Sequence, residues 1–474
     1  MADTATAHHA SPPPTASRLS AYRLAVPIAA LCFFGALALL WCTGAHSLYF
    51  SALRLIGVEP FGFPFLDTHA VLAAAQCRRQ GVDIYLSNPC DALGRPHVYS
   101  PFWLVIMPGF LGVQATSWVG PSLDVLFILS LPIVLRPRTL RDIFLLGLAA
   151  FSPMTVYALE RGNNDLLVYL LIVCASALLV ASRPYRLFSY GLFLTAGLLK
   201  YYPLVLLFLL ARERRRHAIL AASIVSLILI SFGVYYRVDL SRALANVPSA
   251  SYFTDAFSAE NLPLGFAGAL GDGLVRPVIA VLLLSALLMV TAARTRRTLR
   301  LLQREDLDWK QWELQYLAIG SMLVTVCFFA GQNVNYRGVY FLFVLPGLVR
   351  LYRFAGAPVI RRYWGQTIVA VLFVMWDEFF RRSIHAMVAL FTSDELCSRT
   401  DVLFWVGREL VWWWLIAGLA AIVLSYLRQT TFLGRSLAGL RIANTDSAES
   451  TLLGGGAPYS RNHRANCPDS LAGD

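Results

Sequence analysis

The sequence predicts an all-α, polytopic membrane protein: a bundle of about 10–12 transmembrane helices with additional re-entrant and interfacial helices. Of the 474 residues, 57% are hydrophobic and only 14% are charged, which is more apolar surface than a soluble domain needs. Apolar runs of about 20 residues recur, whereas a membrane β-barrel shows alternating segments of about 10. Basic residues gather in short links between the runs, so the net charge of +12 indicates cytoplasmic loops and not nucleic-acid binding.

A single transmembrane domain, residues 21–427, lies between two polar ends. Residues 1–20 and 428–474 are polar, and we expect both to be disordered cytoplasmic termini. Residues 44–98 form the first extracytoplasmic loop of the domain. The apolar runs lie near residues 23–43, 99–112, 117–135, 142–158, 166–182, 187–210, 217–236, 274–293, 314–331, 336–350, 364–376 and 408–427.

The arginines predict which ends of the runs face the cytoplasm. Five links hold 19 of the 40 Lys and Arg residues, at 136–141, 182–186, 211–217, 294–313 and 350–362. Placing all five inside requires an even number of crossings between successive links. Two runs are then re-entrant hairpins, which need protein or water around their broken backbone: the Pro-bounded run 99–112 and the run 187–210. Ten full crossings remain, with both termini in the cytoplasm.

This topology places the polar clusters on the outer side. Asp67, Asp165 and Asn335 each lie next to a predicted helix start, so each has a second interpretation as a helix cap. Glu260 lies in another outer loop. Ionisable residues at membrane depth are costly, and their convergence on one side favours a functional site.

Lys200 interrupts an apolar run at Leu-Leu-Lys-Tyr-Tyr-Pro. A lysine at that position can reach the interface only if the helix ends there, and we expect it to meet a buried anion such as a lipid phosphate. Arg161 and Arg337 are weaker candidates for the same role, because arginine suits bidentate phosphate contacts but also serves as an interfacial anchor. The histidines show no metal-ligand spacing. Cys77 and Cys90 can form a disulfide if their loop is extracytoplasmic.

Several short motifs, taken in order, resemble the polyprenyl-phosphate-sugar-dependent glycosyltransferases of family 87. These enzymes belong to the GT-C superfamily, which includes mycobacterial mannosyltransferases. The motifs are Asp67 after a span, Gly81-Val-Asp-Ile-Tyr85, Tyr99-Ser-Pro101, Arg-Gly-Asn-Asn-Asp followed by an apolar span (161–170), the Leu-Leu-Lys-Tyr-Tyr-Pro run (198–207) and the Asn-Tyr-Arg-Gly run (335–346). The resemblance covers roughly residues 60–350.

The resemblance implies a multi-pass enzyme of the bacterial inner membrane with its active site facing the periplasm. Such an enzyme moves a sugar, such as mannose, from a polyprenyl-phosphate carrier to a hydroxyl of a lipid or glycan acceptor. The transfer inverts the anomeric carbon, and Asp67 corresponds to the general base. We assign the donor phosphate to Lys200, Arg337 and Arg161. The expected substrate-binding residues are Asn163, Asn164, Asp165, Tyr99, Asn335 and Glu260.

The sequence indicates no metal, cofactor or nucleic acid; the expected partners are the donor, the acceptor and the lipid bilayer. Two other classes share some of these features. A transporter or flippase for a lipid-linked glycan also has broken helices and a buried cation, but requires a path open to both sides. In a structural membrane subunit, the polar clusters are only caps and anchors.

Overall fold

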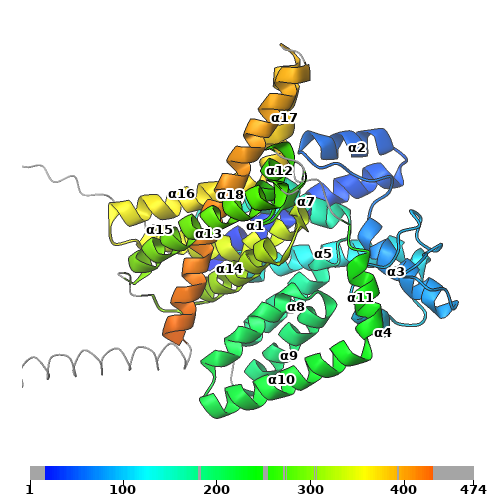
Figure 1. Cartoon of the computed structure of the whole chain (residues 1–474), viewed down its shortest axis with the longest axis horizontal. Helices are drawn as coiled ribbons and strands as arrows, with labels where there is room; N and C mark the ends of the chain where they lie inside the picture. The colour runs from blue at the N-terminus through cyan, green and yellow to red at the C-terminus, as the bar shows by residue number, and fades with distance from the viewer. Residues whose placement is uncertain are drawn as a thin grey trace, which may run out of the picture.

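The computed structural model describes residues 16–430, except 180–182, 249–254, 271, 272, 274, 304, 306, 392 and 393. All its regular elements are helices except one two-stranded sheet, which confirms the predicted fold class (Figure 1). The predicted disordered termini lie almost entirely outside the described residues.

The first half of the chain forms helices only. They are α1 (Ala16–Cys42), α2 (His46–Leu55), α3 (Leu66–Arg79), α4 (Phe102–Ile106), η1 (Val113–Ala115), α5 (Thr116–Val134), α6 (Leu140–Ala150), α7 (Pro153–Glu160), α8 (Asp165–Leu179), α9 (Arg183–Leu199), η2 (Tyr202–Arg212), α10 (Arg215–Tyr235) and α11 (Arg237–Ala245), where η marks a 3₁₀ helix.

The second half adds the sheet. Its elements are β1 (Ala256–Phe257), α12 (Asn261–Leu270), α13 (Val275–Leu302), α14 (Trp312–Ala330), β2 (Asn333–Val334), η3 (Asn335–Tyr340), α15 (Phe341–Phe354), α16 (Pro358–Met375), α17 (Asp377–Ala389) and α18 (Asp394–Thr430). Strands β1 and β2 are antiparallel, with Ala256 opposite Val334. They hold the loop before α12 against the turn that leads into η3.

Six helical segments of the described chain are long and apolar enough to cross a membrane: Ser20–Cys42, Val113–Val134, Arg215–Tyr235, Val275–Leu302, Trp312–Ala330 and Glu395–Thr430. The pair α6 and α7, bent by 51° at Ser152-Pro153, makes a seventh if it is one span. The predicted ten to twelve included shorter runs. Two of these form α8 and α15, of 15 and 14 residues, because the polar turns before them shorten the helices below the roughly 20 residues of a full crossing.

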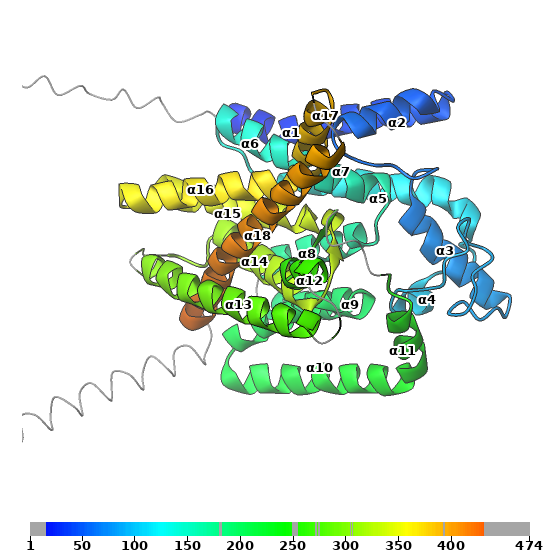
Figure 2. The same ribbon diagram turned by 45° about the horizontal axis from the view of Figure 1, so that its top comes forward.

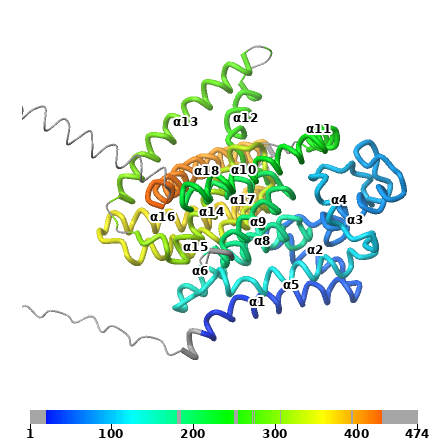
Figure 3. The backbone as a smooth tube through the Cα atoms, turned by 90° about the horizontal axis from the view of Figure 1, so that it is seen from below, coloured from blue at the N-terminus to red at the C-terminus, as the bar shows by residue number. Residues whose placement is uncertain are grey.

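Burial separates central helices from peripheral ones. The most hydrophobic stretch of α14 is 78% buried within the protein, whereas those of α10 and α13 are each 6% buried. Figure 2 shows α10 along one edge of the bundle, and Figure 3 shows α13 standing away from it. Helix α14 therefore forms the core, and α10 and α13 present their apolar side chains outward, as lipid-facing helices do.

Residues 187–210 form the broken element that the sequence predicts. Three contacts between α9 and η2 pair residues symmetrically about position 200: Arg186 bonds Glu213 at 2.9 Å, the Tyr190 hydroxyl donates to the Leu209 carbonyl at 3.2 Å, and Gly197 packs against Leu204. The two helices are thus antiparallel, and Lys200 lies at the tip between them. Pro203 has no backbone N–H to donate, so it cannot continue the α-helical hydrogen bonds of α9.

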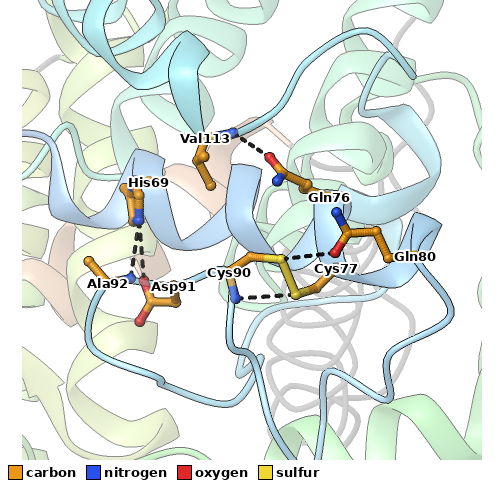
Figure 4. The surroundings of a disulfide bond; sticks show 8 residues. All are labelled: His69, Gln76, Cys77, Gln80, Cys90, Asp91, Ala92 and Val113. Atoms are coloured by element: carbon orange, nitrogen blue, oxygen red, sulfur yellow. Dashed lines mark hydrogen bonds and ion pairs between the residues drawn. A yellow bond between two sulfur atoms is a disulfide. The ribbon is translucent and has the colours of Figure 1, made fainter.

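The first long loop is fixed by a disulfide between Cys77 and Cys90 (Figure 4). Cys77 is on α3, so the bond ties the chain after this helix back to it. Gln76, the neighbouring residue, accepts a hydrogen bond from the Val113 amide at 2.9 Å. The loop is consequently one folded unit with α3, and the disulfide agrees with an oxidising compartment on this side of the membrane.

The helical body has two distinct ends, which all three views show. Helix α3 lies at the right-hand end in Figure 1, and the connection between α15 and α16 lies at the left. The end of α15 next to this connection carries the basic residues Arg350 and Arg353, and α3 carries Asp67. The acidic site candidate and the arginine-rich links are therefore at opposite ends.

We predict that the α3 end is extracytoplasmic. A cysteine introduced as Ser87→Cys, at an exposed position of the first loop, should react with a membrane-impermeant maleimide in intact cells. The matched variant Lys310→Cys, exposed near the start of α14, should react only after permeabilisation. If Lys310→Cys reacts above the parent background in intact cells and Ser87→Cys reacts only after permeabilisation, the proposed topology is wrong.

Candidate functional site

The backbone of α3 is locked against the turn between α7 and α8. Phe65, directly before α3, has the left-handed φ of 65° that is uncommon for a residue with a side chain. Its amide donates to the Glu160 carbonyl at 2.7 Å, and the Asp67 amide donates to the Arg161 carbonyl at 2.9 Å. Gly162 has a φ of 50° and accepts from the Thr68 hydroxyl at 2.6 Å. The first turn of α3 is thereby held at one position.

Asp67 forms a buried, bidentate ion pair with Arg161. The Arg161 Nη2 and Nε atoms lie 2.6 Å and 2.8 Å from the two carboxylate oxygens, and Asp67 is 2% exposed. Burial raises the pKa of Asp67, but the charge and hydrogen bonds of Arg161, with Lys200 and Arg95, outweigh it and hold that pKa below the usual value. The carboxylate therefore serves an ion pair and does not cap α3, which begins one residue earlier, at Leu66.

Asn163 connects this pair to a second acid. Its Nδ2 donates to Asp67 Oδ2, while its Oδ1 accepts from the Asp165 amide at 2.8 Å and from Lys200 Nζ at 3.4 Å. Asn163 has no exposed surface. The Arg161-Gly-Asn-Asn-Asp165 turn thus supplies one continuous chain of polar contacts from α3 to the tip of the α9–η2 hairpin.

Asp165 pairs with the two other predicted cations, Lys200 and Arg337. Lys200 Nζ lies 2.9 Å from its Oδ1 and Arg337 Nε 3.5 Å from its Oδ2, and Tyr202 donates its hydroxyl to Oδ1 at 2.7 Å. Burial lowers the pKa of Lys200, although Asp165 opposes this shift. The structure therefore brings Asp67, Arg161, Asn163, Asp165, Lys200 and Arg337 into one network.

Aromatic rings surround the cations of this network. Lys200 Nζ lies 5.5 Å from the centre of the Tyr99 ring and 5.7 Å from that of Tyr336. The Arg161 guanidinium faces Phe61 at 4.7 Å, and Arg337 faces Tyr202 at 5.2 Å. Cation–π contacts at these distances stabilise positive charge away from water. Tyr99 thus contacts the site through its ring.

The charges do not cancel. Lys200, Arg161 and Arg337 contribute three positive charges, and Asp67 and Asp165 contribute two negative ones, leaving an excess of one. Arg95 Nη1 adds a further cation 4.0 Å from Asp67, although Arg95 itself pairs with Asp91 at 2.8 Å. The site therefore suits an anionic ligand.

Within the described ranges, the side chains of three predicted residues form no hydrogen bond or ion pair with the network. Asn335 donates to Asp377 at 3.3 Å, in a second buried group that includes Glu378, Arg408 and Glu409. Asn164 is 2% exposed, and its Nδ2 has no hydrogen-bond partner among the described residues. Glu260 is exposed, and no hydrogen bond or ion pair within the described ranges links its side chain to Asp67 or Asp165.

Arg95, Tyr202 and Tyr336 also contact the site, although no sequence motif singles them out. The available signal for Tyr202 and Tyr336 is that each stands within two residues of Lys200 or Arg337. Arg408 and Glu409, two adjacent buried charges in α18, are not predicted from the sequence either. In the described part of the chain, no group of three or more His, Cys, Asp or Glu residues is arranged to hold a metal ion.

The fold and the site define an all-helical, multi-pass membrane protein with a buried network of acids and cations at one end. Residues 97–325 match the family model of Glycosyltransferase family 87. This match covers nearly half of the chain and supports a membrane glycosyltransferase. No curated protein and no solved structure matches it. The match includes Arg161, Asp165 and Lys200 but neither Asp67 nor Arg337.

The ion pair predicts a large effect of removing one partner. Arg161→Gln should lower the free energy of unfolding by about 3–5 kcal/mol, because it leaves the Asp67 carboxylate buried without its main counter-ion. Arg54→Gln is the matched control, since its pair with Glu59 is exposed and such pairs contribute about 0–1 kcal/mol. Chemical denaturation in detergent measures both.

The double variant Asp67→Asn/Arg161→Gln should recover part of the loss, because it removes both charges. The difference between parent and Arg161→Gln should shrink as the pH falls, because Asp67 takes up a proton in the folded variant at a higher pH than in the folded parent. A group with a lowered pKa stabilises the fold above its unfolded value and loses that contribution on protonation. A loss for Arg161→Gln no larger than that of the control contradicts the assignment.

Proposed function

We propose that the protein transfers a sugar from a polyprenyl-phosphate carrier to a hydroxyl of a lipid or glycan acceptor on the extracytoplasmic side, with inversion. The main support for this proposal is the position of Asn163 between two candidate catalytic groups. Its amide joins a candidate base, Asp67, to a candidate phosphate-binding cation, Lys200. A transfer of this kind needs both groups at a fixed separation, because a proton leaves the acceptor while negative charge grows on the phosphate.

Asp67 is the proposed general base. Its lowered pKa keeps it ionised at neutral pH. Oδ2 accepts two hydrogen bonds, from Arg161 and Asn163, whereas Oδ1 accepts one, from Arg161. Because a carboxylate oxygen can accept two, Oδ1 keeps a position for an acceptor hydroxyl. Arg161 orients the carboxylate for this contact.

Lys200 and Arg337 are the proposed contacts of the donor phosphate. Both already face one carboxylate, Asp165, which fixes them without neutralising both. The excess positive charge is therefore present before the donor binds. Its attraction for the phosphate grows as negative charge develops on the leaving phosphate. No nucleotide-binding fold is required, since a carrier phosphate already activates the sugar.

The first functional prediction concerns the base. Asp67→Asn should lower the transfer rate per folded protein by about 10²–10⁴, because the amide cannot accept the acceptor's proton. The measurement is transfer of label from radiolabelled polyprenyl-phosphate sugars into lipid or glycan by the purified protein. Asp83→Asn, an acid of the same loop that pairs with Arg242 at 2.8 Å, should keep the parental rate. Parental turnover by folded Asp67→Asn would exclude Asp67 as the base.

Lys200 should affect donor binding as well as the rate. Lys200→Ala should reduce kcat/KM for the donor by about 10- to 100-fold, since a lost charge-assisted hydrogen bond is worth about 1.5–3 kcal/mol. Unlike Asp67→Asn, it should raise the donor KM as well, because the phosphate is charged before the reaction. The control is Arg242→Ala, an exposed cation near the same loop. An unchanged donor KM in Lys200→Ala would remove Lys200 from the phosphate site.

A further inference from the structure

A second charged cavity lies at the end of the bundle that carries the arginine-rich links. Its volume is about 560 Å³, and its charged lining residues are Arg136, Arg138, Lys310, Glu313 and Arg350. Four cations face one carboxylate, which leaves an excess of three positive charges. Cavities of about 300–1,000 Å³ are of the size that holds small ligands.

This cavity is separate from the Asp67 site. Helix α8 begins at Asp165 and reaches the cavity at Ser176, and 11 residues of helix rise about 16 Å. Arg337 and Arg350 likewise stand at opposite ends of the segment formed by η3 and α15. In Figure 1, α3 and the end of α15 lie at opposite ends of the helical body.

The lining leaves part of its charge and polarity unsatisfied. Glu313 pairs with Arg138 at 2.7 Å and lies 3.8 Å from Arg350. Within the described ranges, no ion pair joins Arg136 or Lys310 to an acid. Gln315, which also lines the cavity and is 5% exposed, has an Oε1 atom without a hydrogen-bond donor. An occupant should therefore carry negative charge and a hydroxyl.

The position of the cavity indicates where such a ligand comes from. Arg136 stacks over the ring of Trp312 at 4.5 Å, and Trp312 begins the spanning helix α14. Tryptophan at a helix end is typical of the level of lipid headgroups, and basic pockets between helices at this level bind anionic headgroups. We propose that this cavity binds the phosphodiester of an anionic lipid with a hydroxylated headgroup.

The test measures lipid binding to the purified full-length protein after delipidation, by native mass spectrometry and by the shift of the thermal unfolding midpoint. The probes are short-chain phosphatidylglycerol, phosphatidylcholine and inorganic phosphate. Phosphatidylglycerol should bind, and phosphatidylcholine should not. Arg136→Gln/Arg350→Gln should bind phosphatidylglycerol at least about tenfold more weakly, since each arginine near a phosphate contributes about 1 kcal/mol and 1.4 kcal/mol is tenfold.

Arg214→Gln/Arg215→Gln is the matched control. It removes the same charge from two exposed arginines at the start of α10, outside the cavity, and should keep the parental affinity. Equal losses in both double variants, or equal binding of both lipids, would overturn the proposal. Inorganic phosphate could also bind with the same dependence on Arg136 and Arg350 and displace the lipid. The cavity would then be a phosphate site whose ligand is free phosphate and not a lipid.

One further variant keeps the test decisive if the double variant does not fold. Glu313→Gln removes the single carboxylate of the cavity while keeping a side chain that can bond Arg138. It should bind phosphatidylglycerol more tightly than the parent, because the excess positive charge rises by one. Unchanged or weaker binding would contradict an anion site.

Discussion

The site depends on the buried ion pair between Asp67 and Arg161. Removing two charges from water costs several kcal/mol for each, and only close, bidentate geometry offsets that cost. The pair meets this requirement at 2.6 and 2.8 Å. It does so only if α3 starts directly against the turn after α7, a contact that Gly162 permits and the Thr68 hydroxyl secures. The strained backbone of Phe65 is a consequence of the same requirement.

Asn163 links this ion pair to the cation of the proposed reaction. A side-chain amide presents a donor and an acceptor at once, so one residue bonds the Asp67 carboxylate at one end and the Lys200 ammonium at the other. The base and the cation of the proposed transfer are then held at one spacing before any substrate binds. Donors fixed in advance stabilise developing charge without the reorganisation that water needs.

The parts of this arrangement that the sequence predicts are those with local causes. The break at Lys200 follows from a lysine and a proline within one apolar run, and the disulfide joins cysteines of one loop. The ion-pair partner of a residue is not determined locally. Asp67 pairs with Arg161, 94 positions away, and local sequence patterns such as those of helix caps do not predict that pairing. Asn335 and Glu260 were grouped with Asp67 by side of the membrane. The side of the membrane does not fix a residue's position within the membrane plane. The Asn335 side chain bonds Asp377, and within the described ranges Glu260 contacts neither Asp67 nor Asp165.

The interior between the two charged ends bears on the choice between enzyme and transporter. Tyr169 and Ile172 on α8 have no exposed surface, nor do Leu206 and Leu209 on η2. These side chains lie on the two elements that extend from the Asp67 network toward the basic cavity. A transporter requires a polar path through this layer, whereas an enzyme that receives donor and acceptor from one side requires it closed. The hairpin α9–η2 fits the second arrangement, because it brings Lys200 to the Asp67 site and fills the space behind Lys200 with apolar side chains.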